Sequence, residues 1–151
     1  MNTDDAVTIL LLEDDDGDAK AIQRALRKAK VVNPIVRAID GVEALEMIEG
    51  KNSQKPLTEP FMMLVDINMP RMDGIEFLRH IREQPRLKRA IAFVLTTSSR
   101  DEDVIAAYDL NVAGYVLKDN AGKDFLNLIE QLDCYWRVVR FPKIEPIKGV
   151  E

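Results

Sequence analysis

The sequence predicts an α/β fold, in which a five-stranded parallel sheet carries helices on both faces. Short apolar runs alternate five times with segments whose apolar residues recur at helical spacing. Most of these runs are apolar at consecutive positions, which is typical of strands that are buried on both faces. Because each crossover must return over the sheet before the next parallel strand begins, regular alternation of this kind favours a single parallel sheet.

The elements are predicted one after another along the chain. Residues 7–12 form the first strand, and a helix follows from Ala19 onward, where either Asp16 or Asp18 can cap its start. The second helix is expected to end at Gly50 and the third before Pro85. The later strands are predicted at 34–38, 61–65, 90–95 and 114–117. Each is followed by a helix, and the apolar positions of these four helices are, in order, Val42, Leu45 and Ile48; Ile75, Leu78 and Ile81; Val104, Ile105 and Tyr108; and Phe125, Leu128, Ile129, Leu132 and Trp136.

The composition fits one domain and excludes several classes of protein. Hydrophobic residues make up 46% and charged residues 31% of the 151 residues, enough for a globular domain with its own core. The net charge of −5 gives no general attraction to nucleic acid or anionic lipid. Cys134 is the one cysteine, which excludes an intrachain disulfide, and the apolar run 7–12 is too short to span a bilayer. We therefore expect a cytoplasmic protein that binds neither nucleic acid nor membrane.

Chemically reactive side chains follow four of the five predicted strands. Glu13 and Asp14 follow the first strand, Asp66 the third, Thr96 the fourth and Lys118 the fifth. Ligands of open parallel sheets bind outside the carboxyl ends of the strands. If the first and third strands are neighbours, Glu13, Asp14 and Asp66 crowd together, and three carboxylates repel one another unless a cation neutralises them or a pKa rises. The sequence therefore predicts a binding site at this edge of the sheet.

The donor atoms at this edge favour a magnesium site. Mg²⁺ is usually held by one or two carboxylates with a backbone carbonyl and water, and it leaves room for phosphate oxygens. The candidate ligands are Asp14, Asp66 and the backbone carbonyl of Asn68. An aspartate carboxylate is also a nucleophile toward phosphorus, and Asp66 is best placed to attack. Thr96 can donate its hydroxyl to the transferred group, and Lys118 can pair with its charge.

These motifs resemble those of receiver domains of two-component response regulators. The resemblance covers roughly residues 6 to 135 and is carried by Glu13-Asp14, the turn from Asp66 to Gly74, Thr96, and the segment Gly-Tyr-Val-Leu-Lys at 114–118. It implies a flavodoxin-like, doubly wound sheet with the strand order 2-1-3-4-5. It also implies one receiver domain over residues 1–140, followed by a C-terminal extended arm at 141–151 and by no effector domain.

The resemblance implies a response regulator in a two-component phosphorelay. A histidine kinase would pass its phosphoryl group to Asp66, with Mg²⁺ or another divalent cation held by Asp14, Asp66 and the Asn68 carbonyl, and with Glu13 acting through bound water. Such a protein phosphorylates and dephosphorylates only itself, so it is not an enzyme with a separate substrate. It signals through protein contacts, without a DNA-binding output domain.

Two further positions are implied to change conformation with phosphorylation. In receivers the switch hydroxyl turns toward the phosphate and an aromatic residue of the fifth strand follows it inward, roles that fall on Thr96 and Tyr115. Side chains two positions beyond the acceptor and two beyond the switch hydroxyl affect the lifetime of the phosphate, here Asn68 and Ser98. The face formed by the fourth helix, fifth strand and fifth helix would then change partners.

The chain departs from the usual receiver pattern at two places. Lys118 is followed by Asp119, where receivers commonly carry a proline joined by a cis peptide bond. After the fifth helix, Pro142 and Pro146 exclude further helix and favour an extended arm. This tail, with Asp-Cys-Tyr-Trp at 133–136, is similar to single-domain receivers that partner phytochrome kinases. We therefore expect a sensor histidine kinase, in this subgroup a bacteriophytochrome, as partner, and a homodimer through the fourth helix, fifth strand, fifth helix and the arm.

Two alternative functions use the same fold. A pseudo-receiver would keep the fold for dimerisation or docking without taking up phosphate. An aspartate-dependent phosphatase or dehalogenase would also place an acidic nucleophile on a parallel sheet beside magnesium. Such enzymes need a second acid two residues after the nucleophile, where this chain has Asn68, and a cap domain that the sequence does not contain.

Overall fold

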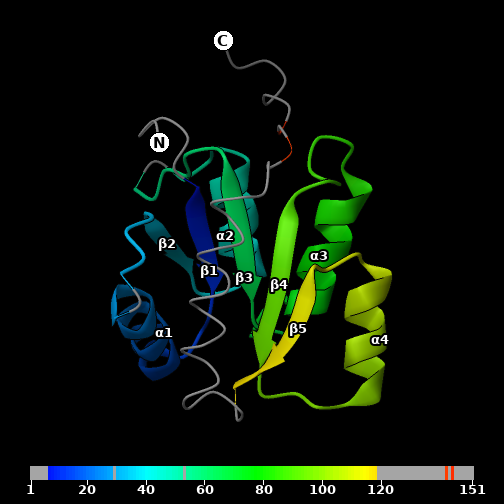
Figure 1. Ribbon diagram of the computed structural model, residues 1–151. Coiled ribbons are helices and arrows are strands. Elements are labelled where there is room, and N and C mark those ends of the chain that lie inside the picture. Colours follow the sequence, from blue (N-terminus) through cyan, green and yellow to red (C-terminus); the bar gives the residue numbers. More distant parts are fainter. Residues whose placement is uncertain (1–6, 29, 53, 119–141, 143, 145–151) are drawn as a thin grey trace.

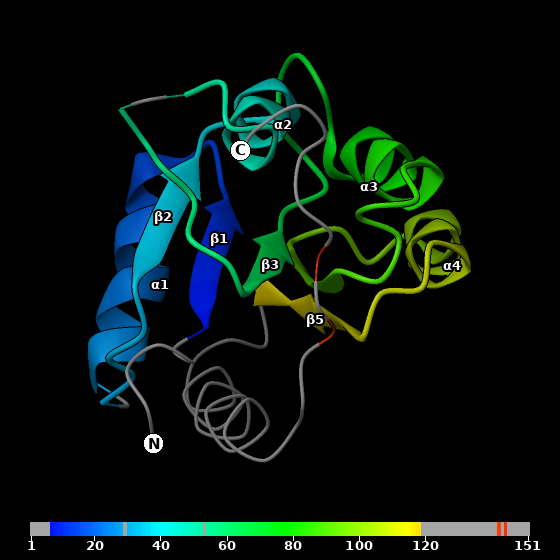
Figure 2. The same ribbon diagram turned by 90° about the horizontal axis from the view of Figure 1, so that it is seen from above.

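Five parallel strands form one sheet in the order β2-β1-β3-β4-β5 within the part of the chain that the computed structural model describes, residues 7–28, 30–52, 54–118, 142 and 144. Helix α1 covers one face of the sheet, and α2, α3 and α4 cover the other (Figures 1 and 2). This confirms the predicted strand order and the helices on both faces. The elements are β1 (Thr8–Leu12), α1 (Asp16–Lys28), β2 (Ile35–Ala38), α2 (Gly41–Ile48), β3 (Phe61–Val65), α3 (Gly74–Glu83), β4 (Ile91–Thr96), α4 (Asp101–Asp109) and β5 (Gly114–Leu117).

Strands β1 and β3 are central and are buried along their whole length. Their register pairs the last residue of β1, Leu12, with the last residue of β3, Val65. Glu13 and Asp66 therefore leave the sheet side by side, and the backbone N–H of Asp66 donates to the Leu12 carbonyl over 3.1 Å. The parallel register is what brings residues distant in sequence to one edge.

Among the residues that the structure describes, the core consists of two apolar clusters, one on each face of the sheet. The smaller cluster lies between α1 and the sheet and includes Ile22 and Leu26 of the helix. The larger cluster lies between the sheet and α2, α3 and α4, and it includes the fully buried Phe77 and Ile81. Burial of each such side chain contributes about 1.5–3 kcal/mol to folding. The sheet that carries the site is therefore packed on both faces.

The start of α1 differs from the prediction. The helix begins at Asp16, three residues before Ala19, and Asp15 accepts a hydrogen bond from the Gly17 N–H over 3.1 Å. Asp16 and Asp18 lie within the first turn, where their charges suit the helix dipole, and Asp15 occupies the position before the helix. The prediction that Asp16 or Asp18 caps the helix is therefore wrong. The first turn is therefore fixed by an aspartate turn, which apolar periodicity does not reveal.

Several predictions concern residues outside the described part of the chain. The fifth helix with Phe125 and Trp136, the Lys118–Asp119 peptide bond and most of the arm at 141–151 are among them. Ile144, which is described, is partly buried and packs against the larger cluster. Among the described helices, none has the length and the apolar character needed to cross a bilayer.

Candidate functional site

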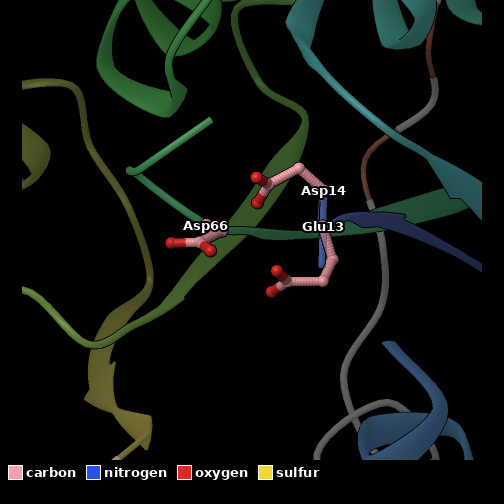
Figure 3. A group of neighbouring side chains, drawn as sticks. All are labelled: Glu13, Asp14 and Asp66. Atoms are coloured by element: carbon pink, nitrogen blue, oxygen red, sulfur yellow. The ribbon is translucent and has the colours of Figure 1, made fainter. Parts of the chain in front are cut away.

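Three carboxylates meet at the carboxyl edge of β1 and β3. Glu13 and Asp14 come from the end of β1 and Asp66 from the end of β3, and one carboxylate oxygen from each lies within 4.8 Å of the others. In Figure 3 the side chains of Glu13 and Asp14 extend toward Asp66. Glu13 and Asp66 are only 1% and 5% exposed, whereas Asp14 is exposed to solvent. Three oxygen donors of this kind fit a hard divalent cation, as predicted from the sequence.

The carboxylate of Asp66 is held by donors from three segments. The Thr96 hydroxyl donates to Oδ1 over 2.8 Å, and the backbone N–H of Asn68 donates to the same oxygen over 3.2 Å. The Lys118 ammonium donates to Oδ2 over 3.1 Å. Thr96 is fully buried and ends β4, and Lys118 directly follows β5. Both residues that were expected to assist Asp66 thus already contact it.

Lys118 forms ion pairs with three carboxylates at once. Its Nζ lies 2.5 Å from Glu13, 3.0 Å from Asp18 and 3.1 Å from Asp66. Burial acts to lower the pKa of Lys118, but the hydrogen bonds to Glu13 and Asp18 and the charge of Asp66 outweigh it and raise this pKa above its ordinary value. The ammonium therefore stays charged and partly neutralises the cluster.

The carboxyl group of Glu13 has a raised pKa in this site. Burial raises the pKa of Glu13 to about 7, the hydrogen bond from Lys118 opposes this, and the charge of Asp66 adds to the rise. Its Oε1 also accepts a hydrogen bond from the Asp15 N–H over 3.2 Å. Burial and the neighbouring charge of Asp66 therefore oppose ionisation of Glu13, and a divalent cation bound among these acids would favour its charged form.

The loop after β4 connects Thr96 to Tyr115. The backbone N–H of Ser98 donates to the Thr96 hydroxyl oxygen over 3.3 Å, and the Tyr115 hydroxyl donates to the Ser98 carbonyl over 2.8 Å. The Ser98 hydroxyl in turn donates to the Asp103 carboxylate on α4. The two residues expected to switch together are thus joined through one residue of this loop.

The turn after β3 is packed against α2. The guanidinium of Arg71 donates to both carboxylate oxygens of Asp40, over 2.6 and 3.1 Å, and Asp40 caps α2 by accepting from the Glu43 N–H. Arg71 has a positive φ of 62°, which an arginine adopts only where its surroundings hold it there. Gly74, at the start of α3, approaches the backbone of Asp66 closely and donates its N–H to the Ile67 carbonyl over 3.0 Å.

The predicted site residues come together in this structure with two qualifications. The contacts of Asn68 that are seen involve its backbone N–H on Asp66, so its carbonyl remains a predicted cation ligand. Tyr115 contacts the Ser98 carbonyl rather than Thr96 itself. Asp18 was missed, since its place in the first turn of α1 indicated only a capping role. Asp18 follows β1 closely in sequence, at the carboxyl ends of the strands, and this position could have indicated that it belongs to the site.

The chain is similar to known proteins of one family. It matches the family described as the response regulator receiver domain over residues 9–130. It is 33% identical over 128 residues to the response regulator Rcp1 of Synechocystis sp., and the aligned region covers 85% of this chain and 87% of that protein.

Solved structures agree with this match. The Mn²⁺-bound form of the response regulator Rcp1 superimposes with a TM-score of 0.78 at 31% identity, covering 91% of this chain and 99% of that one. The phosphorylated cyanobacterial phytochrome response regulator RcpA gives a TM-score of 0.80 at 30% identity, with the same coverage of both chains. With the parallel sheet in the order 2-1-3-4-5 and the acidic cluster at its edge, these matches lead to one conclusion. The chain belongs to the response regulator receiver domain family.

Proposed function

We propose that this protein takes a phosphoryl group from a sensor histidine kinase onto Asp66. The observation that carries the proposal is the environment of the Asp66 carboxylate, which holds the Thr96 hydroxyl on one oxygen and the Lys118 ammonium on the other. A nucleophile placed beside a hydroxyl donor and a fixed cation has partners for the charge that a phosphoryl group brings. The solved structure of RcpA is that of a phosphorylated response regulator, which supports the proposal.

The transfer follows from the geometry of the acceptor. A carboxylate oxygen of Asp66 forms a bond to phosphorus while the bond from phosphorus to the donor's imidazole nitrogen breaks, and that nitrogen keeps the electron pair. The added group carries about −1.5 to −2 charges. Thr96 then donates its hydroxyl to a phosphoryl oxygen instead of to Asp66, and Lys118 pairs with the new charge. Since Ser98 links Thr96 to Tyr115, the movement of Thr96 is passed to β5.

A divalent cation, Mg²⁺ in the proposal, would be held by Asp14, Asp66 and the Asn68 carbonyl, with Glu13 acting through water. Bound there, it would supply positive charge to the acidic side chains and to the phosphoryl oxygens. Asp14 is exposed beside the buried Asp66, so a cation could reach these oxygen donors from solvent. The Mn²⁺-bound form of a relative supports a divalent cation in this family.

The partner and the assembly are also part of the proposal. The relatives include a cyanobacterial phytochrome response regulator, which supports a bacteriophytochrome as the kinase that acts on this protein in the cytoplasm. Helix α4 exposes Ile105 and Tyr108, which are 61% and 51% accessible. The two residues are three positions apart on the helix and therefore lie on one face of it, and contiguous exposed apolar surface often marks protein contacts. We place the homodimer contact on the face that includes α4 and β5, together with the arm at 141–151.

Intact-mass measurement tests the acceptor. The protein is incubated with acetyl phosphate and Mg²⁺, and its mass is expected to rise by one phosphoryl group. The variant Asp66→Asn is expected to gain nothing, and Asp73→Asn, which alters the cap of α3 outside the acid cluster, is the matched control that still gains the group. A wild-type protein whose mass does not change would favour the pseudo-receiver. A gain that persists in Asp66→Asn would place the acceptor elsewhere.

A further inference from the structure

Arg37 reaches from β2 to the loop that carries the acidic cluster. Its Nε donates to the backbone carbonyl of Glu13 over 2.8 Å, and its Nη2 donates to the backbone carbonyl of Asp14 over 3.1 Å. Its Nη1 donates to the carboxylate of Asp16 over 2.7 Å. One guanidinium therefore spans the residues from the end of β1 to the first residue of α1.

The register of the sheet explains why Arg37 can make these contacts. Arg37 pairs with Leu11 across β1 and β2, so its side chain extends past the last residue of β1. The N–H of Glu13 donates to the Ala38 carbonyl over 3.0 Å. Strand β2 thus holds Glu13 on both sides of its Cα, through the backbone of Ala38 and through the side chain of Arg37.

The contacts of Arg37 differ in kind from those of Lys118. Lys118 binds the carboxylates of the cluster directly and neutralises them. Arg37 instead binds the main-chain carbonyls behind two of those carboxylates, and its ion pair is with Asp16, outside the group of three acids. Its guanidinium therefore fixes the backbone and does not take the place of a cation.

We propose that Arg37 is a positioning residue for the divalent cation. By fixing the backbone at Glu13 and Asp14 it orients their carboxylates toward Asp66 before the cation binds, so less conformational entropy is lost on binding. The planar guanidinium of an arginine places separate N–H donors on two neighbouring carbonyls in a fixed geometry, whereas the ammonium of a lysine is a compact charge on a flexible stem and does not fix that geometry. The inference rests on the proposed function, because it assumes that the acids bind a cation.

Calorimetric titration with Mg²⁺ tests this role in four proteins: wild type, Arg37→Lys, Arg37→Gln and Arg82→Gln. Arg37→Lys keeps the positive charge and removes the planar guanidinium, and Arg37→Gln removes both the charge and the guanidinium. Arg82 is the matched control, since its guanidinium also donates to main-chain carbonyls, those of Lys88, Ala90, Leu110 and Asn111. Ala90 directly precedes β4, so these contacts lie at the amino-terminal ends of the strands, whereas the acids lie at their carboxyl ends.

Both Arg37 variants are expected to raise the dissociation constant for Mg²⁺ about tenfold, the lower range for residues that orient metal ligands. Arg82→Gln is expected to leave this constant at the wild-type value, although it is expected to be destabilised in urea unfolding without Mg²⁺, because its contacts with four main-chain carbonyls are lost. If Arg37→Gln does not fold, Arg37→Lys decides the question. A dissociation constant equal to or lower than that of wild type in the folded Arg37 variants would overturn the inference and leave the proposed function intact. A wild-type protein that does not bind Mg²⁺ would overturn both the inference and the proposed cation site.

Discussion

Replacing Gly74 by alanine is expected to destabilise the protein and to displace the backbone of the proposed phosphoacceptor. A Cβ atom built on Gly74 would lie 2.3 Å from the Asp66 carbonyl oxygen and 2.9 Å from the Ile67 Cα. Both atoms belong to the main chain at the end of β3, so no side chain can move aside to relieve the contact. The backbone itself must shift by about 1 Å before the oxygen reaches the 3.4 Å at which ordinary contact begins.

The expected cost follows from that shift. Overpacking in a well-packed region typically costs about 1–3 kcal/mol, and a contact with main-chain atoms belongs at the upper end. The shift also stretches the hydrogen bond from the Gly74 N–H to the Ile67 carbonyl. For a chain of this size, about 3 kcal/mol corresponds to a fall of roughly 6–12 °C in melting temperature.

Two other glycines provide matched controls. A Cβ on Gly17 would lie 3.5 Å from an Asp15 carboxylate oxygen, an ordinary contact, so Gly17→Ala is expected to be neutral or to stabilise α1 by up to about 1 kcal/mol. A Cβ on Gly41 would meet the flexible side chain of Met72 at 2.8 Å, so Gly41→Ala is expected to fall between the two.

The assay combines urea unfolding with the rate of phosphorylation by acetyl phosphate. Gly74→Ala is expected to show both the lowest unfolding free energy of the series and a reduced rate, because the carboxylate of Asp66 moves with its backbone. Equal stability of Gly74→Ala and Gly17→Ala would refute the steric argument. Reduced stability with an unchanged rate would show that the acceptor does not depend on the position of this turn.

Three further predictions concern other parts of the molecule. Burial acts to raise the pKa of Asp40, but the hydrogen bonds from Arg71 and from the capped helix outweigh burial and lower this pKa overall. The charge of Asp40 therefore stabilises the fold above about pH 4, and this stabilisation is lost as the pH falls through the lowered pKa. Asp40→Asn is therefore expected to cost about 1–2 kcal/mol in urea unfolding at neutral pH and less below pH 4, and a cost independent of pH would contradict this. Tyr115→Phe removes the hydrogen bond to Ser98, so faster amide exchange is expected in the loop after β4, and unaltered exchange would count against the link. Removal of residues 141–151 is expected to weaken self-association in sedimentation, and an unchanged profile would argue against a role of the arm in the dimer.

The strands were predictable because short apolar runs alternate with helical segments, and β1 and β3, whose residues are all apolar or β-branched, are buried along their whole length. The bounds of β3 and β5 agree with the predicted 61–65 and 114–117. The helix starts were less predictable, since the turn at Asp15 sets the start of α1 without an apolar signal. β4 extends to Thr96, one residue beyond the predicted strand, because the ladder with β5 continues there.

The site residues that directly follow strands could be predicted from the sequence. The contacts that long side chains make between different helices, strands and loops could not. Parallel register brings any residue that follows a strand to the same edge, so the acids, Thr96 and Lys118 could be grouped from sequence. The contact of Asp18 with Lys118 joins residues 100 positions apart, and that of Arg37 with Glu13 joins residues 24 apart. No sequence periodicity relates such pairs, since they depend on side-chain length and rotamer.

The separation of Glu13 from Lys118 by 105 residues has a consequence for the life of the protein in the cell. The group of side chains around Asp66 is complete only after β5 has docked, so a nascent chain still emerging from the ribosome holds Asp66 without its contact to Lys118. Partial opening at β5 would remove the lysine in the same way while leaving most of the sheet assembled. If Asp66 accepts a phosphoryl group as proposed, only fully folded molecules would present it together with Lys118.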